Sequence, residues 1–305
     1  MTRRLPALLA AAAVVAALAG CAPAGPEPDG LRIVASTNVY GDLAAAIAGD
    51  AATVTSIIDG PAQDPHSYEA SARDRLALAD ADLVVYNGGG YDPFVEALLG
   101  AAGEAEVLEA VAIAGYEGEA GEHAHDDHGH LEGVNEHVWY SIPAMEALAA
   151  AITDTLSALD PEHAADFAAN HAALADRLAA LEARTAELHE QLEGTGVALT
   201  EPVPAHLFAA LGLDDLTPPE FAEAIEEDAG VPPLALEELL DLIASGRVAL
   251  LGYNAQTAGP ETERVRAAAE AAGIPVVDFT ETLPEGADYV SWMTANVEAI
   301  ATALS

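Results

Sequence analysis

Short apolar runs alternate with helical segments along this 305-residue chain, and this alternation restricts the fold more than any other feature of the sequence. The runs in the first half are residues 31–35, 53–58 and 83–86, and those in the second half are residues 197–199, 248–251 and 275–277. Strands that are separated by helices are typical of a parallel sheet covered by helices. The sequence therefore predicts an α/β fold of two lobes, each a mainly parallel sheet flanked by helices.

The helices are expected between and after these strands, at residues 39–48, 71–80, 143–159, 161–192, from 205, 219–227, 235–245, 261–272 and from 287. The segment 161–192 is the longest, and at 1.5 Å per residue it would span roughly 50 Å. Its apolar side chains recur at spacings typical of one helix face, namely Phe167, Leu174, Leu178, Leu181 and Leu188. We expect this helix to join the two lobes rigidly.

Two helix starts carry capping signals. The cluster Ser36-Thr37-Asn38 precedes the helix expected at 39–48, and its polar side chains are able to cap that helix. Ser71 and Asp74 have the spacing of a capping box, with Asp in place of the usual Glu.

The N-terminus has the features of an export signal. Arg3 and Arg4 precede an apolar run from Leu5 to Leu18, which is shorter than the roughly 20 residues that cross a bilayer. The following Leu18-Ala19-Gly20-Cys21 resembles a bacterial lipobox. The sequence thus predicts a signal peptide at 1–20, lipidation of Cys21, and a chain anchored by lipid to the outer face of the cell membrane.

The remaining domain boundaries follow from composition and pattern. Residues 21–30 are rich in Pro and Gly and suit a flexible tether. An N-terminal lobe is expected at 31–160, the linking helix at 161–194 and a C-terminal lobe at 195–305. Because Cys21 is the only cysteine, an intrachain disulfide and a thiolate metal site within one chain are both excluded.

The charge of the chain limits its partners. The formal net charge is -41, and all ten basic residues are arginines. Such a chain is not expected to bind nucleic acid or anionic lipid, because both are themselves negatively charged. An acidic surface does concentrate cations near it.

Five of the ten histidines lie close together, at His123, His125, His128, His130 and His137. The first four belong to a loop at 122–130 in which His alternates with acidic residues, and such a segment cannot build a core. Imidazole is the commonest ligand of transition metals in proteins, so metal handling is the leading interpretation. The alternative is a solvated polar loop without a function.

Four metal-capable residues lie just beyond predicted strands or in the loops that follow them, namely His66, His137, Glu201 and Glu281. In open α/β sheets, ligands bind at the carboxyl ends of the strands. Two neutral imidazoles and two carboxylates balance the charge of a divalent cation, which a buried cleft favours. Each residue alone is a weak signal, and their joint placement in both lobes makes a shared metal site plausible.

At these residues the sequence resembles the metal-binding lipoproteins of bacterial zinc and manganese ABC importers, which are solute receptors with a long helical backbone. Asp64-Pro65-His66-Ser67-Tyr68-Glu69 is similar to a motif of that family. Glu136-His137-Val138-Trp139 is similar to a second motif, with Glu136 where Pro is usual. The resemblance runs from about Ile33 to Ala299 and includes a His-rich insertion just before the second motif.

The resemblance implies a function and a set of ligands. By it, His66 and His137 are ligands from the N-terminal lobe, and Glu281 is the carboxylate of the C-terminal lobe. The third position is open, because many zinc members have His where Glu201 stands whereas manganese members often have Glu, and His206 is a reserve candidate. The implied function is an extracytoplasmic receptor, expected to be a monomer, that delivers a divalent metal to an ABC permease and its ATPase.

Zinc is the expected metal, and manganese or iron is the alternative. The His-rich loop favours Zn²⁺, and the resemblance implies that auxiliary ligands in this loop gather zinc or shield the site, namely His123, His125, His128 and His130. Two carboxylates in one site also suit Mn²⁺ or iron, which favour oxygen ligands. The remaining histidines, which are His163, His171 and His189, lie on the predicted linking helix and are expected to be structural or surface residues.

Two other classes of protein also hold a metal ion. A secreted zinc metalloenzyme is disfavoured because four protein ligands would close the coordination shell to water. The sequence also has neither His-Glu-x-x-His nor Gly-x-Ser-x-Gly. We therefore expect no enzyme activity. An adhesin, or a lipoprotein that holds metal only for stability, is the second rival, and an additional role in cell adhesion stays open.

Overall fold

The structure is a computed structural model that describes residues 30–116, 135–227 and 229–305. Leu31–Ser305 form one compact unit. The predicted signal peptide, the lipidation site Cys21 and the His-rich loop at 122–130 lie outside the described residues. The predicted lobe boundaries remain predictions.

The first sheet is parallel throughout and has the strand order β2-β1-β3-β4. Its strands are β1 (Leu31–Thr37), β2 (Ala52–Ile58), β3 (Leu83–Tyr86) and β4 (Glu106–Glu109). The first three were predicted, whereas β4 was not. Its four residues, Glu-Val-Leu-Glu, are half exposed at the edge of the sheet and lack the apolar run that marks the other strands.

Both faces of this sheet are covered, as a parallel sheet requires. On one face Ile33 and Leu83 join the main apolar core, to which α1 (Asn38–Ala48) and α5 (Ile142–Leu159) contribute. On the other face Val34 and Val84 join a smaller core. That second core includes residues from α2 (Ala72–Ala79) and α3 (Pro93–Glu96).

The second sheet is also parallel, with the order β6-β5-β7-β8. Its strands are β5 (Gly196–Leu199), β6 (Asp214–Asp215), β7 (Leu251–Asn254) and β8 (Val276–Phe279). The two-residue strand β6 was not predicted. Strand β7 begins at Leu251, where the predicted strand ends. Most of the apolar run 248–251 precedes the strand, and the hydrogen-bonded ladder continues through Gly252 to Asn254.

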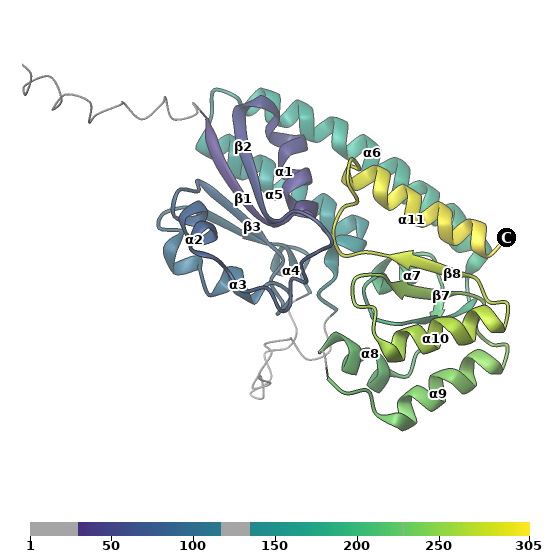
Figure 1. Cartoon of the computed structure of the whole chain (residues 1–305). Helices are drawn as coiled ribbons and strands as arrows, with labels where there is room; N and C mark the ends of the chain where they lie inside the picture. The colour runs from purple at the N-terminus through teal and green to yellow at the C-terminus, as the bar shows by residue number, and fades with distance from the viewer. Residues whose placement is uncertain (1–29, 117–134, 228) are drawn as a thin grey trace, which may run out of the picture. The chain divides into compact units, whose positions relative to one another are not determined.

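The short helices α3 and α4 (Ala110–Ile113) were not predicted. The remaining helices confirm the predicted alternation and are α6 (Ala164–Leu192), α7 (Ala205–Ala210), α8 (Pro219–Glu226), α9 (Pro233–Ala244), α10 (Pro260–Ala271) and α11 (Tyr289–Ala303). Short 3-10 helices lie at η2 (Gly49–Ala51), η3 (Leu99–Ala101) and η4 (Val138–Tyr140). The second sheet packs with α9 and α10 on one side, where a separate apolar core forms. Figure 1 shows α11 alongside α6.

The predicted long helix is present as α6, although it begins three residues later than expected because the chain turns at Asp160, whose carboxylate accepts a hydrogen bond from the Glu162 amide. Its predicted apolar stripe is buried, with Leu178 only 1% exposed. Helix α5 packs against α6, and of the helices in the described ranges it alone is long and apolar enough to cross a membrane. Its buried Met145, Leu148 and Ile152 make it a core helix here.

Of the two predicted caps, one is confirmed and one is wrong. Ser71 and Asp74 form the capping box of α2. Thr37, the last residue of β1, is the N-cap of α1, but its side chain makes no capping bond. The Asn38 side chain is engaged elsewhere, since its amide oxygen accepts from the Leu283 amide at 2.9 Å and its amide nitrogen donates to the Leu283 carbonyl at 3.1 Å.

Candidate metal centre

The topology brings the predicted ligands to the carboxyl ends of both sheets. His66 lies in the loop after β2, Glu201 lies two residues after β5, and Glu281 lies two residues after β8. In the second sheet the strand order reverses between β5 and β7, and ligands bind at such switch points. Glu201 and Asn254, the last residue of β7, both stand at this point.

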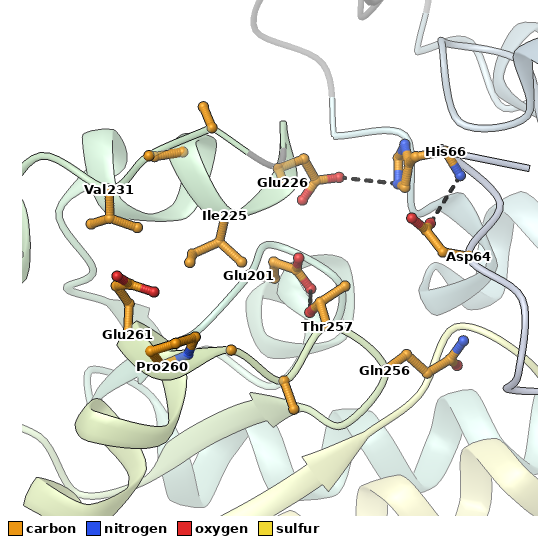
Figure 2. Close-up of a pocket in the computed structure, with 15 residues that line it drawn as sticks. Asp64, His66, Glu201, Ile225, Glu226, Val231, Gln256, Thr257, Pro260 and Glu261 are labelled. Atoms are coloured by element: carbon orange, nitrogen blue, oxygen red, sulfur yellow. Dashed lines mark hydrogen bonds and ion pairs between the residues drawn. The ribbon is translucent and has the colours of Figure 1, made fainter.

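His66 is positioned by a tight polar turn. One carboxylate oxygen of Asp64 accepts a hydrogen bond from the His66 amide at 3.0 Å, and the other accepts one from the Ser67 hydroxyl at 2.7 Å. Figure 2 shows Asp64 and Glu226 on either side of His66. The turn fixes the backbone from which the His66 imidazole reaches the pocket.

His137 is held by Asn135. The Asn135 side-chain oxygen accepts from the His137 amide at 3.0 Å and lies 2.7 Å from the ring atom Nδ1. A neutral His137 that donates from Nδ1 keeps its lone pair on Nε2, the atom that a metal would bind. The Asn135 side-chain nitrogen donates to the Pro202 carbonyl at 2.9 Å, so the same residue also supports the loop that carries Glu201.

Aromatic rings surround the two imidazoles. The Tyr91 ring lies 4.9 Å from the His66 ring and 5.8 Å from the His137 ring, in edge-on contacts. The Trp139 ring lies 5.1 Å from that of His137. Tyr91 follows three glycines with positive φ, and Asp92 closes this loop by accepting hydrogen bonds from the amides of Asn87 and Gly88. Nothing in the sequence indicates that this glycine run places Tyr91 against the histidines.

Glu201 and Glu281 are both buried, and their carboxylates share one hydrogen-bond donor, the side chain of Asn254. The Asn254 side-chain nitrogen donates to Glu281 at 2.8 Å and also to Glu201. The Thr257 hydroxyl donates to Glu201 at 2.6 Å. Burial raises the pKa of Glu201 to about 7. Burial, and then repulsion from Glu201, raises the pKa of Glu281 to about 8.

Three of the four predicted ligands come together closely. His66, His137 and Glu281 each offer a ligand atom, and these atoms lie within 4.8 Å of one another. Glu201 lines the same pocket as His66. It belongs to no group of possible ligand atoms within that distance among the described residues, because its carboxylate is turned to Asn254 and Thr257. The arrangement offers two nitrogens and buried carboxylate oxygens to one cation.

One residue of the centre was missed by the sequence analysis. Glu226, at the end of α8, lies with its Oε1 atom 3.6 Å from His66 Nε2 and 3.3 Å from His137 Nε2. Glu226 also forms a second possible ligand group with His66 and Glu136. Nothing in the local sequence distinguishes Glu226 from the other acidic residues of α8, and only the tertiary fold brings it to the histidines.

The other histidines of the described part of the chain have different surroundings. The His206 Nε2 atom lies 2.8 Å from the Asn135 carbonyl, and its ring lies 4.9 Å from that of Tyr116, so the structure places the reserve candidate behind Asn135. Burial lowers the pKa of His206. His163 lies 2.6 Å from Asp160, His189 lies 3.0 Å from the Ala210 carbonyl, and His171 is half-buried on α6.

The family whose model matches residues 33–303 is described as the zinc-uptake complex component A, periplasmic. The chain belongs to this family. The match covers every residue of the candidate metal centre.

Individual proteins resemble the chain to different degrees. The zinc-binding lipoprotein AdcA of Streptococcus pneumoniae serotype 4 is 28% identical over 288 residues, which cover 90% of this chain and 56% of AdcA. The manganese-binding lipoprotein MntA of Bacillus subtilis is 36% identical over 160 residues, or 50% of this chain and 49% of MntA. The chain thus spans only about half the length of these curated relatives.

Solved structures agree with the fold. The crystal structure of ZnuA superposes with a TM-score of 0.73 at 23% sequence identity, covering 91% of this chain and 100% of that one. The two parallel sheets flanked by helices are therefore the architecture that the family shares.

Proposed function

We propose that this protein is an extracytoplasmic receptor that captures a divalent transition metal, with zinc as its cargo, and delivers it to an ABC permease and its ATPase. The observation that carries the proposal is the convergence of His66, His137 and Glu281 within 4.8 Å at the carboxyl ends of both sheets. A cation that two imidazoles and buried carboxylates bind is satisfied in charge and in ligand type. Membership of the zinc-uptake family supports the same cargo.

Manganese is a second candidate cargo, and the ligand set is what favours it. Three buried or nearly buried carboxylates, those of Glu201, Glu226 and Glu281, face this centre, and oxygen ligands suit Mn²⁺ better than they suit softer metals. The resemblance to MntA is consistent with this alternative. Iron shares the preference for oxygen ligands and stays in the same group of candidates.

The remaining parts of the proposal come from the sequence and the family. We propose that the chain is a monomer held at the outer face of the membrane through lipid on Cys21. In this account the protein binds and releases metal and performs no chemistry on a substrate, in keeping with a family of solute receptors.

Removal of either histidine tests the proposal. Protein purified without added metal would be titrated with Zn²⁺ and with Mn²⁺ against a chelator, for the wild type, His66→Ala and His137→Ala. Each variant loses a nitrogen ligand, so affinity should fall by several orders of magnitude while the metal-free melting temperature stays close to that of the wild type. His163→Ala, which changes an exposed histidine beside α6, is the matched control.

Two results would contradict the proposal. A wild-type protein without a tight divalent site would remove the receptor function altogether. Native affinity in His66→Ala or His137→Ala would show that the tight site lies elsewhere. The ratio of the Zn²⁺ and Mn²⁺ affinities of the wild type decides between the two cargoes.

A further inference from the structure

Glu226 is a nearly buried carboxylate that faces both histidines of the centre. Its side chain is only 9% exposed, and its Oε1 atom lies close to the Nε2 atoms of both His66 and His137. Neither of its carboxylate oxygens receives a hydrogen bond from the described residues. A buried carboxylate without hydrogen bonds is costly, so a native protein that keeps one needs a compensating partner.

The distances from Glu226 to the two imidazoles fit that partner being a metal. Zinc binds histidine nitrogen at about 2.0–2.1 Å and carboxylate oxygen at about 2.0–2.2 Å, so two ligand atoms of a tetrahedral site lie about 3.3–3.5 Å apart. The oxygen of Glu226 lies 3.3 Å from His137 Nε2 and 3.6 Å from His66 Nε2. These two distances are close to the edges of such a tetrahedron, and Figure 2 shows the Glu226 carboxylate directed at His66.

The charges around Glu226 also favour a bound cation. Repulsion from Glu136, Glu201 and Glu281 acts on its carboxylate, which burial already disfavours. None of the described residues that line this pocket is an arginine, so their side chains offer no permanent positive charge. A divalent cation between Glu226 and the imidazoles would supply the missing charge and relieve the repulsion.

We propose that Glu226 is a direct ligand of the captured metal, contributed by α8 beside His66 and His137, and that this added oxygen ligand strengthens the binding of Mn²⁺ more than that of Zn²⁺. The inference rests on the proposed receptor function and deepens it. Zn²⁺ usually binds four ligands, and two of them would be nitrogen atoms here. Mn²⁺ favours oxygen ligands and a higher coordination number. Glu226 is therefore a residue that tunes selectivity as well as affinity.

The test compares Glu226→Gln with Glu223→Gln in the full chain. Gln keeps the size of Glu but removes its charge, and Glu223 is an exposed carboxylate one turn earlier on the same helix. Zn²⁺ alone and Mn²⁺ alone would be titrated against a chelator. We expect Glu226→Gln to weaken Zn²⁺ binding by roughly 10- to 100-fold, the scale of losing an interaction that supports a metal site, and to weaken Mn²⁺ binding further. Glu223→Gln should match the wild type for both metals.

The melting temperature of the metal-free variant excludes misfolding as the cause. Because Glu226→Gln replaces a carboxylate whose charged form is disfavoured by burial and by its acidic neighbours, the metal-free variant should melt at or above the wild-type temperature. If Gln is not tolerated, Glu226→Asp keeps the charge on a shorter stem and should bind both metals with intermediate affinity.

The outcomes separate this inference from the proposed function. Unchanged affinities in Glu226→Gln, with a tight site in the wild type, would mean that Glu226 is a bystander. A higher affinity would mean that Glu226 competes with the metal for the imidazoles, which also overturns the inference. A wild type that binds neither metal tightly would reject the receptor function itself.

Discussion

At the scale of single residues, the centre holds carboxylates whose charged form burial disfavours. Burial raises the pKa of Glu201 to about 7 and that of Glu281 to about 8. In the unfolded chain these groups ionise near pH 4.5, the ordinary value for Glu. Between these limits the folded state binds more protons than the unfolded state, so the folded state loses stability as the pH rises.

We therefore expect the metal-free protein to be most stable at the acidic end of this window. Each unit of pKa shift corresponds to about 1.4 kcal/mol, so raising the pH from about 5 to about 8 should lower the free energy of unfolding by several kcal/mol. Thermal melts of metal-free protein across this range measure the slope. Glu281→Gln removes the larger shift, and its melting temperature should depend less on pH. A melting temperature that rises between pH 5 and pH 8 would contradict the assignment.

The second prediction at this scale concerns Asn135, which supports His137 without a direct role as ligand. Asn135→Leu removes the acceptor of the His137 ring and the donor to the Pro202 carbonyl. Partners that orient a ligand are typically worth roughly 10- to 100-fold in metal affinity, and we expect a loss of that size for Zn²⁺ and Mn²⁺ alike.

Titration against a chelator measures that loss. Asn170→Leu is the control, because it removes a half-buried side-chain hydrogen bond from α6 to the Ile47 carbonyl of α1. Equal losses of affinity in both variants would show that Asn135 acts only through general stability.

At the scale of elements, α6 stabilises the body by burying one face. Leu178→Ala removes a side chain that is 1% exposed within the main core, and such truncations cost about 2–5 kcal/mol. Glu182→Ala, on the exposed face of the same helix, should change stability by less than about 0.5 kcal/mol. Chemical denaturation of both metal-free variants checks this difference. Metal affinity should be kept in both, and its loss in Leu178→Ala would link α6 to the site.

The sequence predicted those elements whose signals are local. Strands β1, β2 and β3 have continuous apolar runs, α6 has a periodic stripe, and the capping box of α2 is a four-residue pattern. Strands β4 and β6 lacked such signals, because β4 is short and half exposed and β6 consists of two exposed aspartates. Such strands form only because a neighbouring strand offers its hydrogen bonds.

The same division applies to the centre. His66 and His137 lie in recognisable motifs, and Glu281 follows a predicted strand. The sequence could therefore predict that these three residues lie close together. Glu226 is far from all three in sequence and sits among other acids on α8, and its approach to His66 depends on how the second sheet packs against its helices. Long-range packing of this kind leaves no pattern in a single sequence.

At the scale of the whole molecule, the two sheets share one core. The main apolar cluster includes Ile33 of β1, Leu199 of β5 and Phe279 of β8, together with residues of α5, α6 and α11. Arg177 and Arg184 of α6 also pair with Asp288 and Glu298, on or next to α11. Because the sheets cannot separate without exposing this core, residues 31–305 should unfold as one cooperative unit.

The last prediction joins this cooperativity to metal binding. A metal that binds only the folded state at about a thousand times its dissociation constant stabilises that state by about 4 kcal/mol. We expect one calorimetric transition for the metal-free protein and one for the metal-bound protein. The transition should lie at a higher temperature when Zn²⁺ or Mn²⁺ is present. A variant lacking residues 122–130 is the better sample, because histidines of that segment can also bind metal in the unfolded chain and reduce the effect. The shift should persist in that variant and disappear in His137→Ala. Two transitions, or a shift that survives the loss of His137, would place the bound metal outside the centre that the two sheets share.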